Sequence, residues 1–140
     1  MRDILAWRML RLIRLWAPVI VWAAIILSAA NDEFSTAHTQ GWLSRIFGEL
    51  PPIANHIFRK GGHITAYAIL GLLAWRAHRS LPVALAIVIG VATADETMQS
   101  MTLTRQGTPF DVLLDTCGAL LALTVVPAVR ARLSSRPRAD

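Results

Sequence analysis

Residues 59–71 read RKGGHITAYAILG, and residues 95–115 read DETMQSMTLTRQGTPFDVLLD. Both stretches place charged side chains at the edges of strongly apolar sequence. A charged group inside a lipid bilayer is costly, so ionisable residues that cluster there mark a functional site by default. The two stretches therefore predict a membrane protein whose polar residues gather at the ends of its helices.

The composition also favours a membrane protein. The chain has 140 residues, enough for one domain (1–140), and 54% of them are hydrophobic while 16% are charged. Soluble proteins average about 25% charged residues. One cysteine, Cys117, allows no disulfide within the chain. The net charge of +5 comes mainly from arginines that flank apolar segments, and no nucleic-acid-binding motif accompanies them, so we expect no nucleic-acid partner.

Four apolar segments have the length of membrane helices. They cover residues 12–30, 53–77, 81–98 and 110–129, close to the roughly 20 residues that a spanning helix needs. The basic start resembles a signal peptide, but its arginines alternate with Leu, Ile and Trp, which favours a retained first helix. We expect an all-α, polytopic membrane protein, built as a single bundle of four transmembrane helices.

The distribution of basic residues predicts the orientation. With the N-terminus inside, the inner segments hold ten basic residues and the outer segments four, so both termini should be cytoplasmic. The outer connection, residues 31–52, contains an apolar stripe over residues 40–50 that predicts a short helix lying in the membrane interface. Pro51, Pro52 and Pro82 should open the helices that follow them. Gly71, Gly90 and Gly118 should allow close helix packing.

The polar residues should share one depth in the membrane. Lys60, His63 and Tyr67 lie on one face of the second predicted helix, since they are spaced by three and four residues. Similar spacing pairs Glu96 with Gln99. Asp111 and Asp115 also share a face, while Arg105 lies in the last loop. Each of these positions falls at the outer end of its helix or between two outer ends. Asp95 lies one residue off its face and is assigned to solvent.

These residue types suit a site for an anionic ligand. Arg59, Lys60 and Arg105 can bind phosphate or carboxylate. Glu96, Asp111 and Asp115 can act as bases or counter-ions. His63 suits proton transfer, because histidine changes charge near neutral pH. A structural ion-pair network of Lys60, Arg105, Asp111 and Asp115 would give the same pattern in sequence.

A metal site is the weaker interpretation. His63, Glu96, Asp111 and Asp115 would favour Mg²⁺, Mn²⁺ or Ca²⁺. No established ligand spacing is present, and Lys60 and Arg105 would repel a cation. We therefore predict no metal and no cofactor.

The ordered motifs resemble those of the VanZ-like membrane proteins. The family pattern, R-K-x-x-H-x-x-x-Y-x-x-L-G, then E-x-x-Q, then R, then D-x-x-x-[ND]-x-x-G, matches residues 59–71, 96–99, 105 and 111–118. Two positions depart from it: Ala66 stands where many members have Glu, and Asp115 where many have Asn. The resemblance implies a bacterial cytoplasmic membrane protein. It also implies a link to teicoplanin resistance through the founding member, although most relatives lack that selection.

Two functions fit the predicted site. The first is a protein that binds an anionic lipid head group or a lipid-linked cell-wall precursor at the outer leaflet and modulates the cell envelope. The second is a lipid phosphate hydrolase or transferase in which His63, Glu96 and Asp111 are catalytic, the basic residues hold phosphate, and Tyr67, Gln99 and Asp115 support them. Ion transport fits less well, because the inner halves of the helices are apolar. Four short helices enclose little interior, which is compatible with a homodimer.

Overall fold

The chain folds into helices alone within the residues that the structure describes, namely 2–30, 36–49, 51–101 and 108–134 of a computed structural model. Five helices follow one another: α1 (Arg2–Ser28), α2 (Thr36–Phe47), α3 (Pro52–His78), α4 (Leu81–Ser100) and α5 (Pro109–Ser134). This confirms the all-α prediction. Two of the four predicted long helices, at residues 53–77 and 81–98, match the observed bounds within two residues, and α5 runs five residues further than predicted at its C-terminal end.

The first helix is longer than predicted. It begins at Arg2 rather than near Leu12. Leu, Met and Arg are good helix formers, so the backbone stays helical through the basic segment before the apolar run. The proline predictions hold, since Pro52 opens α3 and Pro82 lies in the first turn of α4. Arg79 ends α3 in the left-handed region at φ 59°, and its N–H donates to the Trp75 carbonyl.

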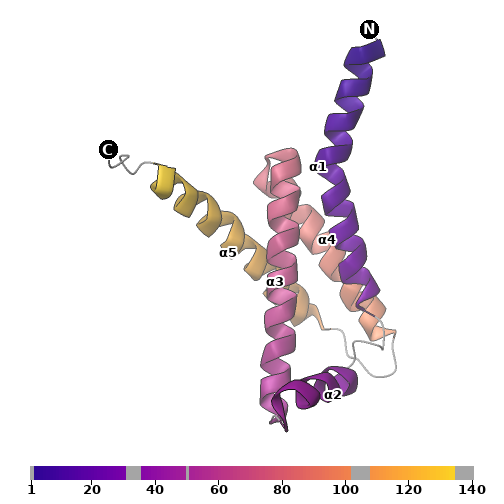
Figure 1. The fold of residues 1–140 in the computed structure, drawn as a ribbon, viewed down its shortest axis with the longest axis vertical. Helices are drawn as coiled ribbons and strands as arrows, with labels where there is room; N and C mark the ends of the chain where they lie inside the picture. Colours follow the sequence, from indigo (N-terminus) through magenta and orange to yellow (C-terminus); the bar gives the residue numbers. More distant parts are fainter. Residues whose placement is uncertain (1, 31–35, 50, 102–107, 135–140) are drawn as a thin grey trace.

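The central element is α3, which contacts all four other helices. Figure 1 shows α2 beside the start of α3, while the N-terminus of α1 and the C-terminal end of α3 lie towards the other end of the molecule. The end of α4 and the start of α5 lie on the same side as α2 relative to the middle of α3. This arrangement brings the polar ends of α3, α4 and α5 together.

Small residues allow the helices to approach closely. Buried alanines line the contact, including Ala74, Ala84, Ala92 and Ala119. A Cβ atom built on Gly118 would lie 2.7 Å from Ile64 Cγ2, and one on Gly71 would lie 3.2 Å from Ala119 Cβ. Both glycines therefore serve the close packing of α3 against α5. The prediction for Gly90 was wrong, because nothing lies within 4 Å of its Cβ position.

Among the described residues, three helices are long and apolar enough to cross a membrane by length and composition: Ile4–Ser28, Leu81–Ser100 and Pro109–Arg132. Large apolar side chains on them are exposed, among them Ile20, Ile25 and Leu121. Such a surface needs an apolar solvent, so this is a multi-pass membrane protein. α3 has the length but carries Arg59, Lys60 and His63, which lower its hydropathy. A four-span bundle with α2 in the interface stays a prediction.

Candidate functional site

Two aromatic rings on α3 lie side by side in the polar cluster. His63 and Tyr67 lie one helical turn apart, and their rings stack with centroids 6.4 Å apart. Tyr67 is fully buried, and its hydroxyl donates to Asp95 Oδ2 at 2.9 Å. This hydrogen bond joins α3 to the end of α4 and satisfies the hydroxyl of the tyrosine. The predicted supporting role of Tyr67 thus has a specific partner.

Asp95 is part of the cluster, contrary to its assignment to solvent. Its side chain is 2% exposed, and Glu96 and Gln99 are buried beside it. Neighbouring residues on a helix point in directions about 100° apart, so burial of both Asp95 and Glu96 requires that protein covers two faces. The end of α4 meets this condition, because it packs against both α3 and α5. An unsatisfied Tyr67 hydroxyl in the apolar helix was the only sequence signal for this partner.

Glu96 and Asp111 hold the start of α5. Glu96 Oε2 accepts from the Thr108 N–H at 2.8 Å, and the Thr108 hydroxyl donates to Asp111 Oδ2 at 2.8 Å. The Asp111 N–H in turn donates to Thr108 Oγ1 at 3.3 Å. These bonds satisfy donors at the first turn of the helix. Thr108 was missed in the sequence, although Thr108-Pro109-Phe110-Asp111 has the composition of a helix start.

Lys60 forms an ion pair with Asp111, which links α3 to α5. The side chain of Lys60 is 32% exposed and that of Asp111 is 17% exposed. The pair lies at the rim of the cluster, above the more deeply buried carboxylates. One contact of the predicted ion-pair network is therefore present. It also means that Lys60 already has an anionic partner.

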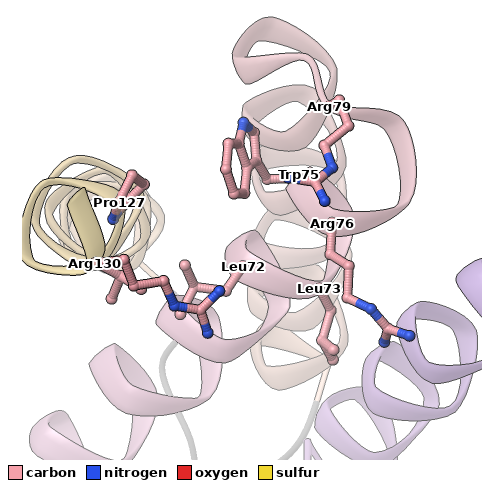
Figure 2. A pocket seen from close by; sticks show the side chains of 8 residues that line it. Leu72, Leu73, Trp75, Arg76, Arg79, Pro127 and Arg130 are labelled. Atoms are coloured by element: carbon pink, nitrogen blue, oxygen red, sulfur yellow. The ribbon is translucent and has the colours of Figure 1, made fainter. Parts of the chain in front are cut away.

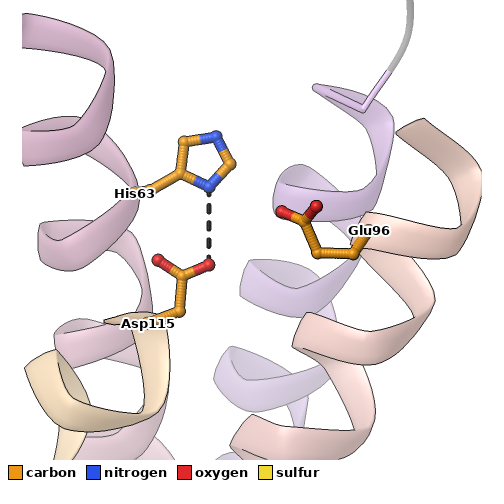
Figure 3. Close-up of side chains that lie close together, drawn as sticks. All are labelled: His63, Glu96 and Asp115. Carbon is orange, nitrogen blue, oxygen red and sulfur yellow. Dashed lines mark ion pairs between the residues drawn. The ribbon is translucent and has the colours of Figure 1, made fainter. Parts of the chain in front are cut away.

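The centre of the cluster is His63 between acidic residues. Its Nδ1 lies 3.6 Å from Asp115 Oδ2 and 3.9 Å from Asp95 Oδ2. Figure 3 shows His63 above Asp115, with Glu96 facing them from α4. One ligand atom from each of His63, Glu96 and Asp115 lies within 4.8 Å of the others. Asp115 Oδ2 is buried and makes no hydrogen bond.

This donor set can bind protons, hydrogen-bond donors or a cation. Three buried carboxylates lie around one imidazole. Of the four residues weighed as metal ligands in the sequence, His63, Glu96 and Asp115 converge, whereas Asp111 is turned to Lys60. Imidazole and carboxylate suit a divalent cation chemically.

The predicted basic trio is only partly visible. Arg59 lies next to Lys60 on α3 and is partly buried. Arg105 falls in residues 102–107, outside the described residues. Because Arg59 and Lys60 are consecutive, they point to different sides of α3. Among the described residues, the site holds one more carboxylate, Asp95, than the sequence predicted.

An unexpected contact joins α1 to the cluster. The indole N–H of Trp22 donates to the Ala66 carbonyl at 2.9 Å, one residue before Tyr67. Nothing in the sequence distinguished Trp22 from the other tryptophans. Its contact holds α1 against the central helix.

The helices are apolar, and the ends of α3, α4 and α5 enclose a polar cluster. This arrangement defines a helical, multi-pass membrane protein with a polar site inside its helix bundle. The chain belongs to the VanZ/LLP1 family, whose sequence model matches residues 13–130. This matches the resemblance seen in the ordered motifs. Neither the comparison with curated proteins nor that with solved structures gave a match.

Proposed function

We propose that the polar cluster faces the outer leaflet of a bacterial cytoplasmic membrane and binds the anionic head group of a lipid or of a lipid-linked envelope precursor. Binding there lets the protein modulate the cell envelope, and both termini are cytoplasmic. A role in glycopeptide resistance is the form that this modulation takes in the founding member of the family.

The observation that carries this proposal is the partly exposed ion pair between Lys60 and Asp111. The Lys60 side chain is 32% exposed, so a ligand can reach its ammonium, whereas Asp111 Oδ1 lies on the buried side of the pair. A phosphate can therefore replace the Asp111 carboxylate at the Lys60 ammonium, which is a good point-charge partner for phosphate. Arg59, the neighbouring residue on α3, adds positive charge at the same level.

The acidic layer beneath the rim suits the rest of such a head group. Asp115 Oδ2 and the neighbouring carboxylates are hydrogen-bond acceptors, and Asp115 Oδ2 has no hydrogen bond. Glycerol and sugar head groups carry several hydroxyl donors. A ligand with a phosphate and hydroxyl groups can therefore bind both Lys60 at the rim and the carboxylates beneath it. An anion without hydroxyl groups would bind only at the rim.

Binding of short-chain lipids to the purified protein tests this proposal. We expect phosphatidylglycerol to bind more tightly than phosphatidylcholine in calorimetric titrations. Lys60→Gln should weaken phosphatidylglycerol binding about fivefold, the effect of about 1 kcal/mol per basic residue near a membrane surface. Arg45→Gln is the matched control, because Arg45 is an exposed cation of α2 outside the cluster. Equal affinity for the two lipids would contradict the proposal.

A second function has its own supporting observation. His63 Nδ1 lies 3.6 Å from Asp115 Oδ2, a geometry that can orient an imidazole as a nucleophile or acid–base group in a lipid phosphate hydrolase or transferase. Asp115 is better placed for this role than Asp111, which is paired with Lys60. Glu96 is the second group for proton transfer.

Phosphate release from a panel of lipid phosphates tests the enzymatic alternative. His63→Ala should abolish release, while His56→Ala, at an exposed histidine of the same helix, should leave it unchanged. Equal release by the original protein and His63→Ala would exclude this mechanism.

A further inference from the structure

A groove lies between α3 and α5 at the end of α3 opposite the polar cluster. It has a volume of about 610 Å³, and its lining includes Leu72, Trp75 and Arg76 from α3, Arg79 directly after α3, and Pro127 and Arg130 from α5. Figure 2 shows Arg130 reaching from α5 towards α3, with Trp75 and Arg79 on the other wall. Its size is within the range of about 300–1,000 Å³ that is typical of small-molecule sites.

The groove exists because α3 and α5 diverge. The two helices are closest at Gly118, against Ile64, and at Gly71, against Ala119. Beyond these contacts, α5 leans away from α3 towards its C-terminal end (Figure 1). Pro127 lies on this diverging part of α5 and lines the opening. The close contact and the groove therefore both result from the angle at which α3 and α5 cross.

The walls of the groove are basic and apolar. Of the described residues that line it, three are arginines and none is acidic. Within the described part of the chain, Arg76, Arg79 and Arg130 form no ion pair with a carboxylate. The guanidinium of Arg79 lies 5.0 Å from the centre of the Trp75 ring. In the sequence, these arginines were interpreted only as signals of orientation.

The groove and the polar cluster lie far apart along α3. Arg76 follows Lys60 by sixteen residues of continuous α3, which is about 24 Å along a helix axis. The hydrocarbon core of a bilayer is about 30 Å thick. Long basic side chains extend towards the membrane surface, so a membrane-crossing α3 places the two regions in opposite leaflets.

The geometry points to a binding site for an anionic phospholipid in the leaflet opposite the polar cluster. The phosphate contacts Arg79 and Arg130, and an acyl chain packs against Leu72 and the Trp75 ring. Basic pockets between membrane helices are suited to such head groups. The apolar walls favour a lipid over a free phosphate, since a soluble anion would leave Leu72 and Trp75 uncovered. This site is separate from the one in the proposed function and does not depend on it.

Quenching of Trp75 fluorescence by brominated lipids tests the site directly. The protein is placed in phosphatidylcholine nanodiscs that contain brominated phosphatidylglycerol or, separately, brominated phosphatidylcholine. The contribution of Trp75 is obtained by difference from Trp75→Phe. We expect phosphatidylglycerol to be enriched at Trp75 at least about tenfold, since each arginine near the surface contributes about fivefold. No enrichment would overturn the proposal.

Three variants and one competitor identify the cause of any enrichment. Arg79→Gln/Arg130→Gln should abolish it, while Arg79→Lys/Arg130→Lys should retain most of it. Arg8→Gln/Arg14→Gln removes the same charge from exposed positions in the N-terminal half of α1 and should have no effect. An equal loss in this control would show general attraction to the basic end and overturn the site. Displacement by millimolar glycerol phosphate, which lacks acyl chains, would show a phosphate site and equally overturn it.

Discussion

At the scale of single residues, the contact between Tyr67 and Asp95 joins two buried side chains on different helices. Both side chains are buried, and the tyrosine hydroxyl donates a hydrogen bond to Asp95 Oδ2. A carboxylate in such a position needs hydrogen bonds, because burial removes its contact with water. The aromatic ring fills the core while its hydroxyl fixes the end of α4. Tyr67 therefore links the packing of the bundle to the geometry of the cluster.

Tyr67→Phe should lower the free energy of unfolding by about 1–2 kcal/mol, because it leaves a buried acceptor without its donor. Unfolding in mixed detergent micelles measures this loss. Thr124→Val is the control, since the Thr124 hydroxyl bonds only to carbonyls of its own helix and is exposed. The double variant Tyr67→Phe/Asp95→Asn should lose less than the sum of the single changes. Strict additivity would contradict a direct contact.

The same residues show how far a sequence can predict a site. His63, Glu96 and Asp115 were expected together, because helical spacing and depth place them at one end of their helices. Asp95 was assigned to solvent, because spacing within one helix does not show how many neighbours cover that helix. The partner of Lys60 was open for a related reason: several carboxylates lie at the same depth, and only the crossing of α3 and α5 selects Asp111.

At the scale of helices, the crossing of α3 and α5 determines both polar regions. Gly118 allows the close approach that brings Asp115 towards His63, and the divergence beyond it opens the basic groove. A change at this crossing should therefore affect the two ends of the molecule together. Residues on α4 have no comparable effect on the groove, because α4 does not line it.

Gly118→Ala should destabilise the protein by about 1–3 kcal/mol, because its added Cβ would overlap Ile64. Gly90→Ala is the matched control: the space around Gly90 is open, and alanine is favoured over glycine in a helix by about 1 kcal/mol. Thermal unfolding in detergent should rank Gly118→Ala below the original protein and Gly90→Ala at or above it. A stable Gly118→Ala would show that the contact is looser than described.

Helix positions were more predictable than their contacts. The apolar runs and the prolines at residues 51, 52 and 82 located four helices, and the stripe over residues 40–50 located α2 approximately. That stripe is divided in the structure: Leu43 is buried, whereas Trp42 and Ile46 are exposed. Which of these side chains is buried depends on where α3 lies, and the periodicity of the α2 sequence does not show the position of α3.

At the scale of the whole molecule, the number of membrane crossings decides the orientation. If α3 crosses together with α1, α4 and α5, both termini lie on one side. If only the three most apolar helices cross, the termini lie on opposite sides. α3 favours the first arrangement, because it contacts every other helix and its charged residues lie before residue 64 and in its last turn, which leaves an apolar middle. Its lower hydropathy then reflects an internal position in the bundle.

Labelling of single cysteines in intact cells tests this arrangement. With Cys117 replaced by Ala, we expect Glu49→Cys to react with an impermeant maleimide from outside. Arg8→Cys and Ser134→Cys should react only after the membrane is opened. Reaction of Ser134→Cys but not Arg8→Cys from outside would indicate three crossings and contradict the four-helix account.

The proposed function requires that Lys60 binds a ligand and not Asp111 alone. Titration of short-chain phosphatidylglycerol into Lys60→Gln and Asp111→Asn tests it most directly. Lys60→Gln should weaken binding about fivefold, whereas Asp111→Asn should strengthen it by a similar factor, because it frees Lys60 from its competing carboxylate. If the ion pair is purely structural, both variants will lower stability and leave lipid affinity unchanged, and that result would contradict the account.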